Sequence, residues 1–239
     1  MHDLTPGGPQ LDLVRRLLEV GKPVTVVMID GRPETLFDVG ERCDALVAAW
    51  YPGEEGSAAL AELLFGDANF SAKLPVTFPT HVGQTVVYHD RVPSAGGFYH
   101  QPGTPDRPGR DYVFASPKPA YEFGFGLGYS KLRYSDLTAE RIPEGIRATV
   151  AVENGGAYHA DEAVLAFIRD EVATFPQPVK KLAAMKRVPI PAGEQVTVEL
   201  VIPTEELAFT GITMEKKLEK GWFTVMVGDQ SARVYVDAP

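Results

Sequence analysis

Residues 50–67 read WYPGEEGSAALAELLFGD, and with KLPVTFP at residues 73–79 they form the stretch that decides the fold. An apolar run ends at Trp50, and Pro52 and Gly53 then break it, which is typical of a tight turn after a buried strand. The Ala- and Leu-rich run that follows has helical spacing. The local pattern therefore predicts a strand, a turn and a helix, which are the elements of an α/β layer.

Two features predict where this helix begins and ends. Glu54 and Glu55 are expected in its first turn, where carboxylates stabilise the positive end of the helix dipole. Gly66 is expected to take the left-handed conformation that ends a helix, and the proline-rich run after it does not continue one. The buried face is expected to consist of the leucines at helical spacing, Leu60, Leu63 and Leu64.

The motifs of this stretch resemble those of a known enzyme family. Their order, W-Y-P-G-x-E-G, L-F-G-D and K-L-P-V-T-F-P, is similar to the C-terminal half of glycoside hydrolase family 3, the β-glucosidase and β-xylosidase family. Residues 121–130, YEFGFGLGYS, are similar to the family's Y-P-F-G-Y-G-L-S-Y-T segment, and residues 179–188, VKKLAAMKRV, to its V-K-x-L-x-G-F-x-R-V strand. The resemblance spans nearly the whole chain and about the last third of a family member.

The residues before the deciding stretch alternate between helical and strand patterns. An amphipathic helix over residues 11–19 is expected to cover a sheet. Residues 24–29, VTVVMI, predict a parallel strand covered on both faces, and residues 30–33 form the loop at its C-terminal end, where α/β folds place functional groups. A short helix over residues 35–42 and a second strand over residues 44–50 follow. This order predicts the end of a doubly wound sheet.

The C-terminal part has a period of two, which is typical of half-buried strands. Asn154-Gly155-Gly156 is expected to make a turn, and residues 164–168 are apolar on both faces, which suits a central strand. Short alternating strands with frequent turns predict an antiparallel β-sandwich. The resemblance implies the same, because the last domain of the family is a fibronectin type III-like sandwich. The other alternating runs are residues 146–152, 196–202, 223–227 and 234–236.

The predicted fold class is therefore α/β plus all-β. A partial α/β sandwich, the end of a doubly wound sheet, is followed by a fibronectin type III-like antiparallel β-sandwich. We expect residues 1–80 to form the C-terminal part of the α/β sandwich domain, residues 81–130 a wrapping loop or linker, and residues 131–239 the fibronectin type III-like domain. The middle segment is rich in Pro, Gly, His and Asp and is too long for an ordinary connection.

Composition narrows the classes of partner. The 239 residues are 44% hydrophobic and 23% charged, which is ordinary for a globular protein of one or two domains. The net charge of -9 disfavours nucleic acid and anionic membranes as partners, because both are polyanions. Cys43 is the single cysteine, so an intrachain disulfide is excluded. No signal peptide or membrane-length apolar run is apparent, and the chain as written is expected in the cytoplasm.

No catalytic residue is expected within this chain. A retaining glycosidase needs two carboxylates about 5 Å apart across the sugar. The resemblance implies an Asp nucleophile from a barrel domain and an acid/base Glu upstream of the W-x-P-G motif, both before Met1. Glu54 and Glu55 do not replace them, because neighbours in a helical turn point about 100° apart. A turn and dipole role is favoured for this pair, with an indirect role near the site left open for Glu55.

Four residues are predicted to lie near the substrate in the complete enzyme. Trp50 is either a platform for a sugar ring or a packing residue at a strand end. Glu55 matches the family's motif Glu. Tyr88 and His89 belong to YHDRVPS, residues 88–94, which resembles the family's Y-N-H-x-P-S-G-R loop with changes at its polar positions.

Two other constellations favour structural roles. Three glycines could cradle a phosphate. However, a dinucleotide-binding loop opens a helix, whereas these glycines are followed by a strand pattern. A packed turn is therefore expected. Histidines and aspartates of the middle segment match no metal-ligand spacing, and a solvated loop is expected. We expect neither a cofactor nor a metal. The glycines are Gly124, Gly126 and Gly128, and the candidate metal ligands are His81, His89, His100, Asp90 and Asp106.

The leading hypothesis is the C-terminal portion of a family 3 β-glucosidase-like enzyme, which in complete form hydrolyses terminal β-linked glycosyl residues with retention. This portion alone is expected to be inactive. The expected partners are a β-linked oligosaccharide or glycoside and, as possibilities, an N-terminal barrel chain or further copies of this chain. Two alternatives stay open. One is a non-catalytic subunit that completes a separate barrel chain, and the other is a carbohydrate-binding module built on the β-sandwich.

Overall fold

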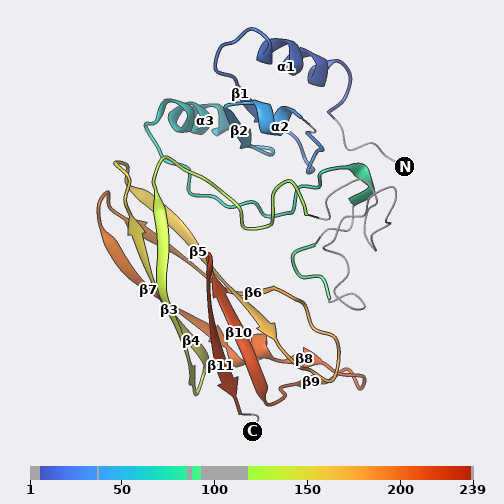
Figure 1. The fold of residues 1–239 in the computed structure, drawn as a ribbon, viewed down its shortest axis with the longest axis vertical. Coiled ribbons are helices and arrows are strands. Elements are labelled where there is room, and N and C mark those ends of the chain that lie inside the picture. Colours follow the sequence, from blue (N-terminus) through green and yellow to red (C-terminus); the bar gives the residue numbers. More distant parts are fainter. Residues whose placement is uncertain (1–5, 37, 85–87, 93–117, 238–239) are drawn as a thin grey trace, which may run out of the picture. The chain divides into compact units, whose positions relative to one another are not determined.

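The computed structural model describes residues 6–36, 38–84, 88–92 and 118–237. These residues divide into two compact units, which the chain visits alternately (Figure 1). The described residues of the first unit are 6–36, 38–68, 74–84, 88 and 118–123, and those of the second are 69–73, 89–92 and 124–237.

The first unit contains a short parallel sheet with helices. Strands β1 and β2 pair in register from Thr25 opposite Ala45 to Met28 opposite Ala48. The parallel pair and the helix between the strands confirm the expected α/β pattern. The elements are α1 (Gln10–Leu18), β1 (Thr25–Met28), α2 (Val39–Arg42), β2 (Ala45–Ala48), α3 (Gly56–Phe65) and a 3₁₀ turn at Val82–Gln84.

Burial in this unit is lower than the sequence predicts. Helix α1 forms as expected but buries none of its residues against the described chain, and Leu13 is 58% exposed. The expected helix over residues 35–42 is limited to Val39–Arg42. The small core consists of Met28, Leu36 and Phe78, with half-buried Trp50 packed against it.

Helix α3 corrects two expectations. It begins at Gly56, so Glu54 and Glu55 precede the helix, and Glu55 occupies the N-cap position without a side-chain capping bond. The expected leucine face is not buried by the described residues, because Gly56 is the one buried residue of α3 and Phe65 is 85% exposed. The C-terminus is as predicted: Gly66 has a φ of 85° and ends the helix in the left-handed conformation.

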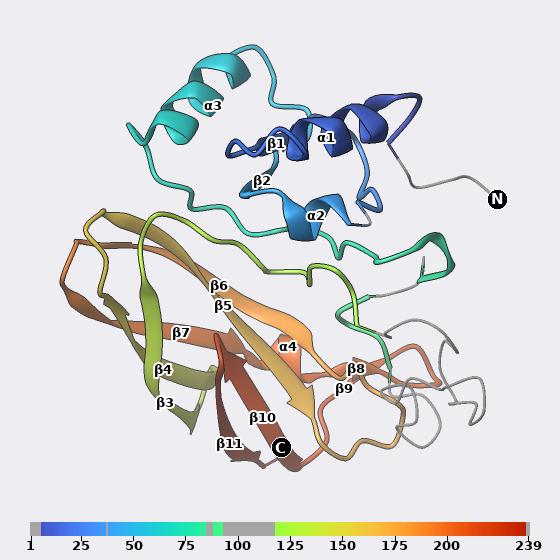
Figure 2. The ribbon, with the colours of Figure 1, turned by 45° about the horizontal axis from the view of Figure 1, so that its top comes forward.

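The second unit is an antiparallel β-sandwich of a four-stranded and a three-stranded sheet (Figure 2). The strand order is β11-β10-β5-β6 in one sheet and β3-β4-β7 in the other, with β8 and β9 as a separate small hairpin. The predicted fold class is therefore confirmed. The strands are β3 (Leu132–Ile142), β4 (Gly145–Asn154), β5 (Ala160–Asp170), β6 (Lys181–Ile190), β7 (Gln195–Pro203), β8 (Phe209–Thr210), β9 (Lys216–Lys217), β10 (Gly221–Val227) and β11 (Gln230–Val236), and α4 (Thr204–Leu207) lies between β7 and β8.

Alternation along the strands builds one continuous core between the two sheets. Strand β10 buries Phe223, Val225 and Val227, and the residues between them face outward. Strand β5 lies between β10 and β6, which confirms the central strand expected from its apolar run. The core also includes Ile146, Val150 and Val152 of β4, Ile190 of β6 and Val198, Leu200 and Ile202 of β7.

Asn154 organises the crossing from one sheet to the other. Its amide nitrogen donates to the carbonyl oxygens of Tyr158 at 2.7 Å and Ile190 at 3.1 Å, and its side-chain oxygen accepts from the Gly156 N–H at 3.0 Å. The residue is fully buried, and β4 ends on it. The expected turn at 154–156 therefore begins on a buried hydrogen-bonding residue, whereas Gly155 is exposed.

The glycine-rich block packs against residues 69–73 within the second unit. A Cβ at Gly126 would lie 2.6 Å from the carbonyl oxygen of Ala72, and one at Gly128 would lie 2.7 Å from Oδ1 of Asn69. Such distances leave no room for a side chain. The block is thus a packed structural turn, as favoured from the sequence.

Candidate functional site

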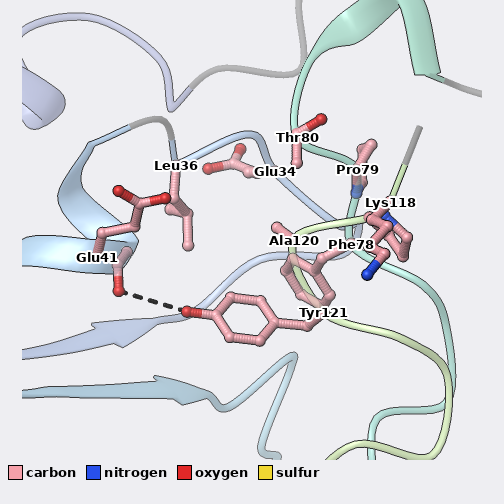
Figure 3. A pocket seen from close by; sticks show the side chains of 11 residues that line it. Glu34, Leu36, Glu41, Phe78, Pro79, Thr80, Lys118, Ala120 and Tyr121 are labelled. Atoms are coloured by element: carbon pink, nitrogen blue, oxygen red, sulfur yellow. Dashed lines mark hydrogen bonds between the residues drawn. The ribbon is translucent and has the colours of Figure 1, made fainter. Parts of the chain in front are cut away.

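A pocket of about 530 Å³ lies in the first unit (Figure 3). Its walls come from the loop after β1, from α2, and from residues 78–80 and 118–121. The volume is within the range of about 300–1,000 Å³ that is typical of small-molecule sites. The lining residues are Glu34, Leu36, Gly40, Glu41, Phe78, Pro79, Thr80, Lys118, Pro119, Ala120 and Tyr121.

Two distant segments are held together to form one side of this pocket. The Phe78 N–H donates to the Tyr121 carbonyl at 2.8 Å, and the Ala120 N–H donates to the Phe78 carbonyl at 2.9 Å. Gln84 is almost completely buried; its side-chain oxygen accepts from the Thr80 N–H at 2.8 Å, and its nitrogen donates to the Lys118 carbonyl at 3.1 Å. Because buried polar groups must be paired, Gln84 fixes the spacing of the two segments.

Glu34 is an acidic group of this pocket whose pKa is shifted by its surroundings. Burial raises its pKa above the usual 4.5, and the nearby Asp30 carboxylate raises it further, while Arg32 lowers it in part. The Arg32 guanidinium lies 3.8 Å from the Glu34 carboxylate. Glu34 is therefore easier to protonate than an exposed glutamate.

Tyr121 forms an aromatic wall of the pocket. Its ring meets that of Phe78 edge to face at 6.3 Å, and its hydroxyl donates to the Gly40 carbonyl at 3.4 Å. Burial is the main cause that raises its pKa, followed by the charges of Cys43 and Glu41. The hydroxyl therefore stays protonated and can donate a hydrogen bond.

The chemistry of the pocket suits a small hydroxyl-rich ligand. Glu34 and Glu41 offer hydrogen-bond acceptors from one side, Lys118 carries an ammonium on another, and the half-buried Tyr121 ring offers an apolar surface (Figure 3). Within the described ranges, no group of three His, Cys, Asp or Glu side chains is placed to hold a metal ion. Two of the candidate ligands, His100 and Asp106, lie outside the described residues.

Trp50, one of the four residues predicted to lie near the substrate, packs next to a residue that lines the pocket. Its ring lies 5.9 Å from that of Phe78, which lines the pocket, and its φ of 53° is unusual for a non-glycine residue. Trp50 packs half-buried on the small core and does not line the pocket itself. Glu55 is exposed at the start of α3.

Tyr88 and His89 fall in different units. Tyr88 belongs to the first unit and is 61% exposed. His89 belongs to the second unit, where its ring lies 6.1 Å from Phe167, and burial lowers its pKa below the usual 6.5. The structure does not bring the four predicted residues together within one unit.

Sequence reasoning missed Glu34, Glu41 and Lys118. One available signal was the position of residues 30–33 at the C-terminal end of a parallel strand, where α/β folds place function. The facing wall comes from residues 118–121, about forty positions along the chain from Phe78, and no local pattern predicts that contact.

Comparisons of sequence give a consistent result. The profile of the Glycosyl hydrolase family 3 C-terminal domain matches residues 2–129, and that of the Fibronectin type III-like domain matches residues 162–231. A relative from Salmonella typhimurium named Periplasmic beta-glucosidase is 34% identical, and the match covers 94% of this chain and 30% of the relative. A Beta-xylosidase from Formosa agariphila is 34% identical, with coverage of 96% and 31%.

Comparison with solved structures gives the same result. The beta-glucosidase from Listeria innocua in complex with isofagomine matches with a TM-score of 0.87 and 30% identity, over 98% of this chain and 34% of that one. The chain thus spans about a third of the length of the relatives that it matches. No described helix has the length and apolar character needed to cross a membrane.

Proposed function

Because the chain belongs to glycoside hydrolase family 3, we propose that it works as the C-terminal portion of a β-glycosidase. The observation that carries this proposal is the pair of matched domains, together with relatives of which the chain covers about a third. The complete enzyme would hydrolyse terminal β-linked glucosyl or xylosyl residues with retention of configuration. The division into residues 1–80, 81–130 and 131–239 is part of this proposal.

The uncovered surfaces of the first unit support the need for further polypeptide. Among the described residues, β1 and β2 pair only with each other, so each has an open edge. Helix α1 exposes Leu13 and Leu17, and α3 exposes Phe65. A parallel sheet is normally covered on both faces, so additional strands and helices would stabilise this unit.

We assign binding and support, not bond cleavage, to the first unit. The nucleophile and the acid/base are proposed to come from the rest of the enzyme. Trp50, Glu55, Tyr88 and His89 remain our predicted substrate-proximal positions. The pocket around Glu34 is proposed to hold sugar hydroxyls, because its carboxylates and aromatic ring match that chemistry.

Hydrolysis of 4-nitrophenyl β-glucoside and β-xyloside tests the proposal. The isolated chain is expected to release no nitrophenol above background. A fusion in which residues 1–239 replace the matching third of the Listeria innocua beta-glucosidase is expected to hydrolyse a substrate and to release the β-anomer first, as seen by proton NMR. Robust turnover by the isolated chain would contradict the proposal.

A second candidate is a non-catalytic subunit that completes a separate barrel chain. The same open strand edges and exposed apolar side chains favour it. Here the chain is expected to co-purify with a separately expressed N-terminal part of a relative and to restore its activity. A monodisperse chain that neither binds nor activates that part speaks against this second candidate.

A further inference from the structure

Two aromatic side chains form an exposed corner on the outer face of the four-stranded sheet. Trp222 of β10 and Tyr235 of β11 are directly opposite in the strand register, and their rings lie 5.3 Å apart at 69°. Trp222 is 45% exposed and Tyr235 is 40% exposed, although the alternate residues of both strands are buried in the core. We call this pair the aromatic corner.

Charged neighbours hold the aromatic corner in place. The Arg233 guanidinium lies over the Trp222 ring, 4.6 Å from its centroid. Arg233 also makes a bidentate pair with Glu171, with Nε and Nη2 donating at 2.8 and 2.7 Å, and Thr224 donates to the same carboxylate at 2.8 Å. A guanidinium fixed on both sides loses little freedom when a ligand arrives.

The corner is electrically balanced and can both donate and accept hydrogen bonds. The charges of Arg233 and Glu171 cancel within their pair. Two of the five guanidinium N–H groups are used by Glu171, so others remain for a ligand, and the Tyr235 hydroxyl can donate or accept. Such a setting favours a neutral, hydroxyl-bearing ligand over a charged one.

The size of the corner favours a small ligand over a protein. An aromatic side chain buries about 150–250 Å² when fully covered, so these two half-exposed residues offer roughly 100 Å² each. A stable protein interface takes about 800 Å² from each partner. On the same outward face, Thr224 and Ser231 are polar and Met226 is half-buried, so these residues add little apolar area.

We propose that the aromatic corner is a binding site for a pyranose unit of a β-linked glucan or xylan, where the choice of β-linked polymers rests on the proposed function. Pyranoses with equatorial hydroxyls present C–H groups on their faces, which carry a slight positive charge and are attracted to the negative face of an aromatic ring. Trp222 supplies that ring through the face that Arg233 does not cover, and Tyr235 forms the side wall and offers its hydroxyl. The inference does not depend on hydrolysis, because binding is measured without turnover.

Native affinity electrophoresis of the full 239-residue chain tests the proposal, in gels that contain β-glucan, xylan, soluble α-glucan or no polysaccharide. We expect β-glucan or xylan to retard the chain and α-glucan to leave it unchanged. Trp222→Ala and Tyr235→Ala are each expected to weaken retardation about tenfold, as for the loss of a stacking contact. Trp222→Phe keeps an aromatic ring and is expected to retain most of the effect.

Phe65→Ala is the matched control, because it removes an aromatic ring that is 85% exposed in the other unit; it is expected to migrate like the parent chain. If Trp222→Ala does not fold, the Trp50→Phe variant leaves Trp222 as the sole tryptophan, and cellotetraose is expected to shift its emission. No retardation and no shift, or retardation that survives Trp222→Ala, would overturn the proposal. The proposal would also be overturned if the chain binds no sugar but self-associates through this corner. Self-association would be seen as concentration-dependent sedimentation that Trp222→Ala abolishes.

Discussion

Lys73 and Glu162 form an ion pair of 2.8 Å, although 89 positions separate them in the sequence and only 18% and 7% of their side chains are exposed. The same carboxylate oxygen accepts the Tyr134 hydroxyl at 2.7 Å, and the Lys73 ammonium also donates to the Gly126 carbonyl at 3.2 Å. The pair thus joins the segment 69–73, the glycine-rich turn and β5 of the β-sandwich.

Removal of one partner of this pair is expected to destabilise the β-sandwich. Lys73→Met leaves the Glu162 carboxylate buried without its cation, and a loss of about 3 kcal/mol is expected in the free energy of unfolding. The double variant Lys73→Met with Glu162→Leu is expected to lose less, because no buried charge remains. Urea unfolding followed by Trp222 fluorescence in a Trp50→Phe background measures both; equal losses would show that the pairing is not what matters.

Asn154 is expected to be among the least replaceable residues of the sandwich. Asn154→Ala removes the side-chain partner of the Ile190 carbonyl and of the Gly156 N–H and leaves the Tyr158 carbonyl with its bond from Ser130 Oγ, and the expected loss is about 3 kcal/mol of stability. Asn154→Asp keeps the shape but turns an acceptor toward two carbonyl oxygens, so a loss at least as large is expected at pH 7. An Asp variant as stable as the parent chain would refute this account.

Gly228 and Gly193 separate two effects of a side chain at a turn. Both have positive φ values, 60° and 75°, so alanine is strained at either position. A Cβ at Gly228 would also lie 2.7 Å from the Tyr134 ring, whereas no described residue apart from the two chain neighbours comes within 4 Å of one at Gly193. We expect Gly193→Ala to cost about 1 kcal/mol and Gly228→Ala about 3 kcal/mol in urea unfolding. Similar losses of stability for the two variants would show that the Tyr134 ring moves aside at little energetic cost.

Glu219 is expected to make stability depend on pH below about 4.5. Hydrogen bonds from Lys217 and Thr174 lower its pKa from 4.5 to about 2. Since a carboxyl with a lowered pKa stabilises the fold only when ionised, its contribution is complete above pH 4.5 and is lost as the pH falls through about 2. The stability difference between the parent chain and Glu219→Gln should therefore be largest above pH 4.5 and vanish near pH 2. A difference that is independent of pH would contradict this.

The sequence was sufficient where the pattern is local. Alternation along β4, β7 and β10 predicted which residues enter the sandwich core, because each strand has one buried face. Gly66 predicted the end of α3 because it is a residue that adopts positive φ without strain. The apolar spacing in α1 and α3 predicted helices correctly, but it did not reveal that their apolar sides lack a cover in the described chain.

Contacts between distant segments were beyond the reach of one sequence. The Lys73–Glu162 pair and the walls of the Glu34 pocket depend on how strands and loops meet in space. Trp222 is an intermediate case. Its neighbours Phe223 and Val225 were expected in alternating strand positions, so its outward direction follows, yet the opposition to Tyr235 needs the register of β10 and β11.

The alternating path of the chain has a consequence for how such a protein can be rearranged in evolution or in the laboratory. Residues 69–73 belong to the β-sandwich, yet the chain returns to the first unit at residue 74 before it enters the sandwich again. A single recombination point after residue 123 would therefore transplant a sandwich that lacks Lys73 and leave Glu162 without its cation. A gene fusion that keeps this ion pair has to carry residues 69–73 together with the sandwich.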